Sequence, residues 1–520
     1  MRARMIAGVA AVMATLAGAT LTGVQPAVGG ARTESGSAAP DDGLRAFQQQ
    51  KISWHGCRTG PDDEAGKELD EAEAQCAEFT VPLDYRHPDG RTLRVALSRL
   101  KATRPALRRG ALFYNPGGPG VPARHLALKV GQAEPEVAAR YDLIGMDPRF
   151  VGRSSPLDCG WPTTAVGSAG PDRRGFDRSV ALAKDLAQRC APHSAVLPHA
   201  STRNTARDMD VIRAALGESR ISYLGSSYGT YLGSVYLQLF PRRVDRAVLD
   251  SALDPDLFGP DLTHTQGPAM TAALTNWAAW TARHDGRYRL GATTEQVLSA
   301  VDRINRAVDR GPLHVGSHRV DSRTLPMVLW NVSAGDDEAT YADFAASVRV
   351  LHDAAGGLEV TPTPLLDAIL VGVISPDVEG AASVQSAVLC ADRAAGRDPE
   401  TYYRGIEAHR DDEPVFGPLI YNISPCSFWP AAPAEPPTEV RNRVPVLLVG
   451  ADGDPAATYP GQRRAHEVLA GSRLVTLRGA FHHTVYAGLF APRNSCVERA
   501  VNRYLITGLL PARDTDCATP

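Results

Sequence analysis

Short apolar runs alternate with amphipathic stretches through the first half of the chain. Strand-like runs stand at residues 92–100, 111–114, 141–146, 221–224 and 246–255, and helical patterns at 204–217 and 230–240. Strands that alternate with helices indicate a largely parallel sheet with helices on both faces. The pattern therefore predicts an α/β fold.

The pattern changes near residue 256 and changes back near residue 437. Between them the chain is mostly helical in pattern, at 270–284, 294–308, 340–355 and 364–374. Strand-like runs return at 444–449 and 472–477, and a helical pattern follows at 496–508. We predict a core formed by 47–255 and 438–520, with residues 256–437 inserted as a helical cap.

The first 31 residues have the pattern of a secretory signal peptide. Arg2 and Arg4 precede an apolar stretch from Met5 to about Val24, and small residues follow near 28–31. A membrane anchor is the competing interpretation, but glycines and threonines dilute the run. Residues 32–46 are rich in Ser, Gly, Pro and Asp and predict a flexible leader. We expect a secreted, extracellular protein with no stable membrane insertion after the signal is removed.

Composition adds one exclusion. The 520 residues contain 55 Lys and Arg against 58 Asp and Glu, a formal net charge of -3. A nucleic-acid-binding protein normally shows an excess of basic residues. We therefore expect no nucleic-acid partner.

Eight cysteines follow the predicted signal peptide, at Cys57, Cys76, Cys159, Cys190, Cys390, Cys426, Cys496 and Cys517. An even number in an exported chain predicts disulfides, and pairing of sequence neighbours is our expectation among the 105 possible connectivities. No C-x-x-C motif occurs, and Ala470 stands where a metalloprotease helix that began at His466 would need its second histidine. We predict no metal and no cofactor.

Gly225, Ser226, Ser227, Tyr228 and Gly229 form the pattern G-x-S-x-G between a strand-like run and a helical one. In this pattern a sharp strand-to-helix turn exposes the central serine hydroxyl above a sheet. The flanking glycines fit such a turn, because it leaves no room for side chains. Ser227 is thus the candidate nucleophile.

A serine nucleophile needs an imidazole to take its proton and a carboxylate to orient that imidazole. The strand-like run at 444–449 leads to Asp452 and Asp454, and the run at 472–477 leads to His482 and His483. The order Ser, Asp, His is that of one hydrolase class. We favour Asp454, because Asp-Pro fixes a turn just past the strand, and we choose His482 over His483 by a narrow margin.

The oxyanion of the reaction needs two backbone N–H donors. One comes from the residue after the nucleophile, which is Tyr228, and the other from a glycine-rich loop after an earlier strand. Gly117 or Gly118, in NPGGPG, can present that second amide. Phosphate binding is the alternative for such a loop, but neither a Gly-Lys-Ser/Thr sequence nor a G-x-G-x-x-G helix start follows.

Several segments together resemble the secreted tripeptidyl aminopeptidases and the proline iminopeptidase-like α/β-hydrolases. They are VPLDYRHPDG (81–90), YNPGGPG (114–120), DPRFVGRSS (147–155), YLGSSYGTYLG (223–233), CSFWP (426–430), DGDP (452–455) and SRLVTLRGAFHH (472–483). The resemblance implies an α/β-hydrolase core under a helical cap, with Ser227, Asp454 and His482 as the catalytic residues. It also implies peptide substrates with free N-termini, from which tripeptides are released.

Two other functions stay open at this point. A secreted esterase or lipase-like hydrolase would use the same three residues, because the nucleophile machinery does not distinguish an ester from an amide. A catalytically silent binding protein could also have this fold, although an intact Ser, Asp, His order argues against it.

Overall fold

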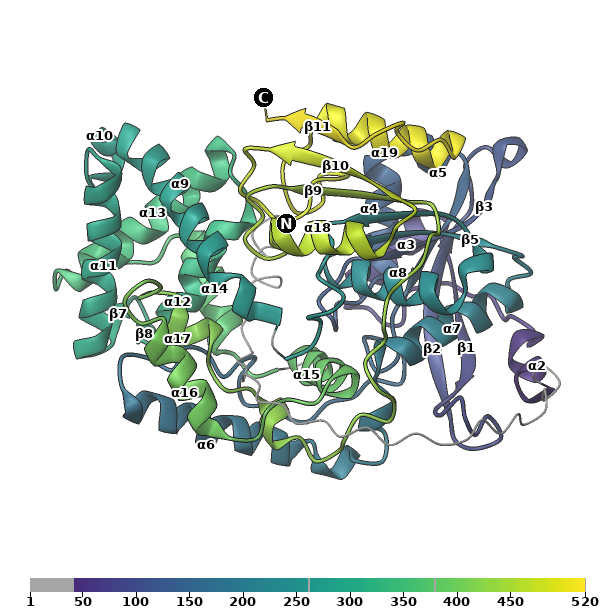
Figure 1. The fold of residues 1–520 in the computed structure, drawn as a ribbon, viewed down its shortest axis with the longest axis horizontal. Helices are drawn as coiled ribbons and strands as arrows, with labels where there is room; N and C mark the ends of the chain where they lie inside the picture. Colours follow the sequence, from purple (N-terminus) through teal and green to yellow (C-terminus); the bar gives the residue numbers. More distant parts are fainter. Residues whose placement is uncertain (1–41, 261, 378–379, 520) are drawn as a thin grey trace, which may run out of the picture.

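A nine-stranded sheet forms the right-hand half of the molecule in Figure 1, in a computed structural model that describes residues 42–260, 262–377 and 380–519. The strand order is β1-β2-β4-β3-β5-β6-β9-β10-β11. Strand β2 pairs antiparallel with both β1 and β4, and the strands from β4 to β11 pair in parallel. This order and these directions are those of the α/β-hydrolase fold, so the predicted fold class is correct.

The strands lie where the apolar runs predict them, with two additions. Their bounds are β1 Gln75–Pro82, β2 Thr92–Leu100, β3 Gly110–Asn115, β4 Tyr141–Met146, β5 Ile221–Ser226, β6 Val244–Asp250, β9 Val446–Ala451, β10 Ser472–Arg478 and β11 Thr515–Ala518. The pattern did not predict β1, which borders the sheet, or β11, which is only four residues long. The inner strands β3, β4, β5 and β9 are buried along their whole length, as expected of strands covered on both faces.

Helices cover both faces of the sheet. The helices of the core are α2 Asp42–Gln48, α3 Glu64–Glu71, α4 Arg124–Ala133, α5 Pro135–Ala138, α7 Thr202–Ala215, α8 Tyr228–Leu239, α18 Tyr459–Val468 and α19 Ser495–Thr507. Alternate residues of one strand enter different cores: Leu224 of β5 packs in the cluster that contains α4 and α19, whereas Tyr223 packs in the cluster that contains α7 and α8. The sheet is thus the middle of three layers.

The left-hand half of the molecule in Figure 1 is mainly helical. Its helices are α6 Arg173–Arg189, α9 Gly267–Arg283, α10 Asp285–Tyr288, α11 Thr294–Arg310, α12 Leu325–Leu329, α13 Glu338–Ala355, α14 Pro364–Ile374, α15 Ala381–Asp392, α16 Pro399–Ala408 and α17 Gly417–Ile420. A small hairpin, β7 Leu313–Val315 with β8 His318–Val320, lies among them. All of these elements except α6 lie within residues 256–437.

Helix α6 belongs in space with that helical part, although it lies within the predicted first core segment 47–255. Figure 1 shows α6 next to α16. Asn422 donates to the carbonyl of Gly167 at 2.8 Å and to Ser179 Oγ at 3.1 Å, and Ala169 donates to the carbonyl of Pro418 at 2.8 Å. The helical half is therefore built from two separate stretches of the chain, and the single cap segment that we predicted omits the first of them.

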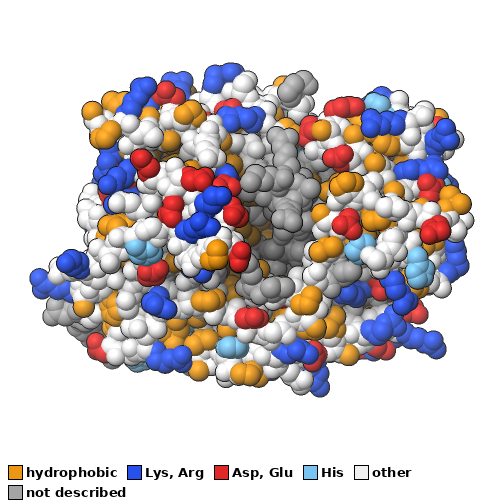
Figure 2. Space-filling model, turned by 180° about the vertical axis from the view of Figure 1, so that it is seen from behind, with side chains coloured by type: hydrophobic (Ala, Val, Ile, Leu, Met, Phe, Trp, Pro, Cys, Tyr) orange, Lys and Arg blue, Asp and Glu red, His pale blue; other side chains and the backbone are white. Residues whose placement is uncertain are grey.

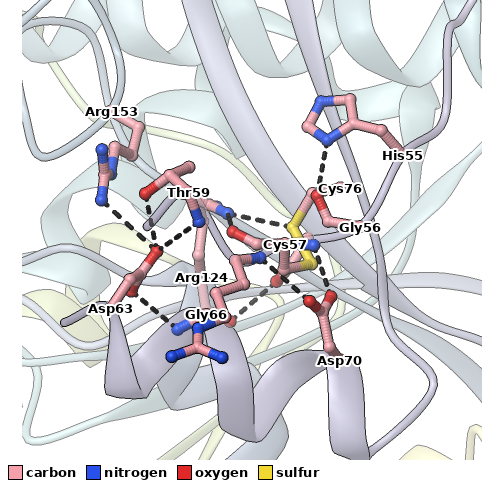
Figure 3. The surroundings of a disulfide bond; sticks show 12 residues. His55, Gly56, Cys57, Thr59, Asp63, Gly66, Asp70, Cys76, Arg124 and Arg153 are labelled. Atoms are coloured by element: carbon pink, nitrogen blue, oxygen red, sulfur yellow. Dashed lines mark hydrogen bonds and ion pairs between the residues drawn. A yellow bond between two sulfur atoms is a disulfide. The ribbon is translucent and has the colours of Figure 1, made fainter. Parts of the chain in front are cut away.

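Four disulfides join sequence neighbours, which confirms the predicted pairing. They are Cys57–Cys76, Cys159–Cys190, Cys390–Cys426 and Cys496–Cys517. Figure 3 shows the first of them, which ties the segment before α3 to β1. Asp70 of α3 accepts the amide of Arg58 at 3.2 Å, and Arg124 Nη2 lies 3.0 Å from Cys76 Sγ. The bridge is thus surrounded by polar contacts that fix the start of the sheet.

The predicted signal peptide, 1–31, lies outside the described residues, as does most of the predicted leader, 32–46. Residues 42–46 are described and are not a flexible leader, because they belong to helix α2, which packs against α7. Phe47 provides the reason, since its ring packs against the main hydrophobic core. Within 42–519, apart from the three residues left out, no helix has the length and apolar character needed to cross a membrane.

Acidic and basic side chains lie interspersed on the face of the molecule shown in Figure 2. On this face the basic side chains do not gather into the concentrated basic surface that binds a nucleic-acid backbone.

Candidate active site

Ser227 stands at the junction between strand β5 and helix α8, as the G-x-S-x-G pattern predicts. Its backbone has φ 56° and ψ -124°, a conformation that a residue with a side chain adopts only under strain. The tight turn also explains the two flanking glycines. A Cβ on Gly225 would lie 2.3 Å from the carbonyl oxygen of Gly229, and a Cβ on Gly229 would lie 2.4 Å from that of Asn115.

The glycine-rich loop after β3 lies against Ser227. A Cβ placed on Gly117 would be 2.8 Å from Ser227 Cβ and 3.1 Å from the amide nitrogen of Tyr228. Gly117 also has φ +107°, which only glycine adopts without strain. The backbone of this loop therefore passes closer to the candidate nucleophile than any residue with a side chain would permit.

Two backbone amides beside Ser227 are candidates for the oxyanion site. Tyr228 begins α8, so its amide has no acceptor within the helix. The amide of Gly117 already donates to Asn115 Oδ1 at 3.0 Å, whereas that of Gly118 has no acceptor among the residues described. Of the two glycines that the sequence left open, the structure favours Gly118 as the free donor.

Asp454 follows strand β9, and its histidine partner is His483. Nδ1 of His483 lies 2.9 Å from Asp454 Oδ2 and 3.1 Å from Oδ1. The carboxylate is completely buried and also accepts the amides of Ala456 and Ala457, each at 2.9 Å. On the other side of the ring, Nε2 of His483 is buried and has no partner within the described part of the chain. Nε2 of His483 is therefore available to accept a proton.

The pairing of Asp454 with His482, which the sequence led us to expect, is wrong. His482 Nδ1 lies instead 2.7 Å from Oδ1 of Asp336, a residue of the helical half. The backbone bends at both residues, and the two imidazoles reach different carboxylates, so only that of His483 contacts Asp454. Both histidines lie in the loop that the sequence indicated. His482, however, binds Asp336, which lies 146 positions away in the chain.

Asp250 and Ser251, at the end of β6, connect the serine turn with the histidine loop. The carbonyl of Asp250 accepts the amide of Ser227 at 3.0 Å. Its carboxylate accepts the amides of Val485 and Tyr486 at 3.0 and 3.1 Å, and Ser251 Oγ accepts that of Thr484 at 2.9 Å. One dipeptide thus holds the backbones that bear Ser227 and His483. No pattern in the sequence pointed to a role for either residue.

The electrostatics of the site follow from burial and from close carboxylates. Burial alone would lower the pKa of His483, but Asp454 and, less strongly, Asp250 raise it above its ordinary value. Burial raises the pKa of Asp250 to about 7, although the amides of Val485 and Tyr486 act in the opposite direction. His483 therefore has two carboxylates near it, of which Asp454 is the one that its ring contacts.

Two further acidic residues, Asp392 and Glu435, could be considered for binding a substrate amine, but both have partners already. Asp392 accepts the amide of Thr202 at 2.8 Å as well as its hydroxyl, and Thr202 Oγ1 lies 2.9 Å from the Tyr228 hydroxyl. Glu435 forms ion pairs with Arg203 and Arg207. Asp392 is thus part of a hydrogen-bonded chain that ends on the residue after Ser227.

Among the described residues, one group has the spacing to hold a metal ion. His409, Asp412 and Glu413 place one ligand atom each within 4.8 Å of one another. They lie just after α16 in the helical half. None of them contacts the serine turn or the histidine loop, so we assign them no part in the chemistry.

Comparison with known proteins places this geometry in a family. The family model described as "TAP-like protein" matches residues 413–517, and the one described as "alpha/beta hydrolase fold" matches 110–328. A tripeptidyl aminopeptidase of Streptomyces lividans is 35% identical over 477 residues, which cover 85% of this chain and 83% of that protein. Serine protease Hip1 of Mycobacterium tuberculosis is 30% identical over 472 residues, 85% of this chain and 87% of that protein.

A third relative has a different printed activity. Carboxylesterase B of Mycobacterium tuberculosis is 29% identical over 521 residues, 95% of this chain and 94% of that protein. All three relatives are matched over most of their length, so the likeness includes the helical half as well as the sheet. The protein belongs to the tripeptidyl aminopeptidase family of α/β-hydrolases and is a serine hydrolase.

Proposed function

We propose that the protein is a serine exopeptidase that releases short peptides, specifically tripeptides, from the free N-termini of its substrates. The observation that carries the proposal is the buried ion pair between Asp454 and His483. The loop that bears His483 is bound by the dipeptide Asp250–Ser251, and the same dipeptide accepts the amide of Ser227. Peptide substrates and the tripeptide product are inferred from the relatives named tripeptidyl aminopeptidase and serine protease.

In this proposal Ser227 Oγ attacks the carbonyl carbon of the peptide bond while His483 Nε2 takes its proton. The amides of Tyr228 and Gly118 donate to the oxyanion of the tetrahedral intermediate. His483 then gives the proton to the leaving amine, and the peptide stays on Ser227 as an ester. A water molecule, deprotonated by His483, hydrolyses the ester and restores the serine. Asp454 orients the imidazole and stabilises its charged form.

The proposed site differs in one residue from the one that the sequence suggested, since His483 replaces His482 as the base. The contact with Asp454 supports this choice, because a catalytic histidine needs a carboxylate on the nitrogen that does not face the nucleophile. His482 has its Nδ1 on Asp336 and is assigned no proton transfer.

Hydrolysis of a free tripeptide anilide, of its N-acetylated form and of short acyl esters tests the activity. We expect hydrolysis of a tripeptide anilide with a free amino group, and a loss of at least about tenfold in kcat/KM when that group is acetylated. Ser227→Ala should abolish both hydrolysis and labelling by a fluorophosphonate, with Ser226→Ala as the matched control that keeps labelling. Equal cleavage of the free and the acetylated peptide would rule out an exopeptidase that recognises the N-terminus.

An esterase is the second candidate, and the likeness to a carboxylesterase is the observation that favours it. The same experiment separates the two functions. An esterase would hydrolyse short acyl esters at a higher kcat/KM than any peptide anilide, and acetylation would leave its peptide activity unchanged.

We also propose that the protein acts outside the cell. The four disulfides support this location, because such bonds persist in oxidising compartments. Fractionation of the producing cells, followed by detection of the protein in the medium with residues 1–31 removed, is the direct test.

A further inference from the structure

The histidine loop is held by two different parts of the molecule. Residues after His483 are bound by the core, since Thr484 donates to Ser251 and Val485 donates to Asp250. Phe481 and His482 are bound by the helical half through Asp336, whereas the core binds Ala480 before them, whose carbonyl accepts the amide of Gly453 at 3.0 Å. Oδ2 of Asp336 accepts the amide of Phe481 at 2.7 Å, and its Oδ1 contacts the ring of His482 at the same distance.

The helical half also contacts His483 itself. The carbonyl of Ser333 accepts the amide of His483 at 3.4 Å. Ser333 lies at the end of the helical turn η6, Trp330–Ala334, three residues before Asp336. Asp337 follows and caps α13, where its side chain accepts the amides of Ala339 and Thr340. Residues 333–337, which bind the histidine loop, are therefore fixed at the start of the 18-residue helix α13.

The last backbone contact from the helical half is at His483, the backbone of Thr484 is bound by the core, and the chain is strained at that point. Thr484 has φ +66°, which is unusual for a β-branched residue and persists only where surrounding contacts enforce it. If the anchor on the helical side were lost, the backbone at Thr484 could relax toward an ordinary conformation. That relaxation would move His483, the residue just before it.

The charges at this contact favour a strong bond. Asp336 is largely buried, which by itself would raise its pKa, but the hydrogen bonds from His482 and from the amide of Phe481 bring the pKa below its ordinary value. Its carboxylate is therefore ionised at neutral pH. A charged acceptor forms stronger hydrogen bonds with an amide and an imidazole than a neutral acceptor does.

We propose that Asp336 is a positioning residue of the helical half, and that its bonds to Phe481 and His482 hold the catalytic base in place. His483 can then accept a proton from Ser227 only while the helical half contacts the histidine loop of the core. The inference rests on the proposed role of His483 and goes beyond it, because it makes proton transfer at the base depend on contacts from the other half of the molecule.

The test uses Asp336→Asn in the full-length protein, with Asp343→Asn as control. Asp343 is an exposed carboxylate on α13, one and a half turns from its start. We measure kcat and KM for a peptide anilide, the rate of reaction with a fluorophosphonate, and the melting temperature. Fluorophosphonate needs Ser227 and its base but no peptide-binding site, so its rate reports on the nucleophile and its base and not on peptide binding.

We expect Asp336→Asn to lower kcat and the fluorophosphonate rate together by about 10- to 100-fold, with KM changed less than about twofold. Asp343→Asn should leave kcat, KM and the fluorophosphonate rate unchanged. A folded Asp336→Asn variant with normal kcat and labelling overturns the inference, even if its melting temperature is lower. If Asp336→Asn does not fold, His482→Ala provides the test, because this variant keeps the bond between Asp336 and the amide of Phe481. A lower kcat at unchanged KM supports the inference. An unchanged kcat overturns it.

The two proposals fail in different ways. If the wild-type protein does not react with the fluorophosphonate, the catalytic roles of Ser227 and His483 are wrong and the inference falls with them. If the wild type reacts and Asp336→Asn reacts equally fast, only the inference is wrong.

Discussion

The imidazoles of His482 and His483 bind carboxylates from opposite halves of the molecule. His483 contacts Asp454, which follows strand β9 of the sheet, at 2.9 Å. His482 contacts Asp336, which precedes helix α13 of the helical half, at 2.7 Å. We therefore propose different purposes for two adjacent residues, proton transfer for His483 and attachment of the helical half for His482.

This difference predicts unequal effects of the two alanine substitutions. His483→Ala removes the proposed base and should lower kcat by at least about 10³-fold with the fold intact. His482→Ala should also lower kcat measurably, but by no more than about tenfold, since the amide of Phe481 still binds Asp336. Steady-state kinetics of both variants provide the measurement, and a larger loss in His482→Ala would reverse our assignment.

The pKa of His483 predicts how activity depends on pH. The base must be neutral to accept a proton, so activity is lost as the pH falls through the pKa of His483. Because Asp454 raises that pKa, the acid limb of kcat/KM should have its midpoint above 6.5. In Asp454→Asn the raising charge is gone while the burial that lowers the pKa remains, so any residual activity should persist to lower pH. A midpoint that stays in place in this variant contradicts the assignment of Asp454.

Space around Gly117 predicts a severe effect of a small substitution. In Gly117→Ala the new methyl group would lie 2.7 Å from the carbonyl oxygen of Ser226 and 2.8 Å from Ser227 Cβ. The alanine would also have to adopt φ +107°. We expect kcat to fall by about 100-fold or more, because a displacement of about 1 Å at the reacting groups has an effect of that size. Gly60→Ala, where a methyl group meets nothing within 4 Å, is the matched control and should be fully active.

Asp250 should contribute to stability as well as to activity. In Asp250→Ala two buried amides, those of Val485 and Tyr486, lose their acceptor. An unpaired buried amide costs about 1–3 kcal/mol, so the free energy of unfolding should fall by at least that amount. Urea unfolding checks the value, with Asp245→Ala, at an exposed position of the same strand, as control. Equal stability of the two variants would show that the loop does not need Asp250.

Loss of a disulfide should affect the two halves of the molecule differently. The Cys390–Cys426 bridge closes a segment with a sequence separation of 36 in the helical half. Its removal by paired Cys→Ala substitutions should lower the free energy of unfolding by about 3–4 kcal/mol. We expect KM to rise as well, because the bridge fixes α15, whose first residue Ala381 lies against Gly120 of the glycine-rich loop beside Ser227. Removal of Cys496–Cys517, at the far edge of the sheet, should leave KM unchanged while stability falls by a similar amount.

Local patterns predicted the parts of this protein that depend on local physics. The apolar runs gave the inner strands, because β5 and β9 are buried on both faces and contain few polar residues. The turn at Ser227 was predictable because glycines at 225 and 229 are a local requirement. Asp454 could be chosen because the strand before it and the proline after it are both visible in the sequence.

The remaining features depend on contacts between distant segments. Nothing near His483 distinguishes it from His482, and the choice is made by Asp336, a residue of another half of the molecule. The role of Asp250 could not be predicted either, since its acceptor contacts are with amides 235 and 236 positions away. Helix α6 has an ordinary amphipathic pattern, and its contacts with residues such as Tyr403 and Asn422, rather than that pattern, reveal the half to which it belongs.

The placement of α6 limits how the molecule can be divided. A fragment that contains only residues 256–437 would expose the surfaces of Pro418 and Asn422 that normally contact the stretch around Gly167 and Ser179. Anyone who wishes to exchange specificity between relatives by grafting has to transplant the stretch closed by Cys159 and Cys190 together with the longer insertion. A chimera made with a single pair of crossover points would combine surfaces that were never matched to each other.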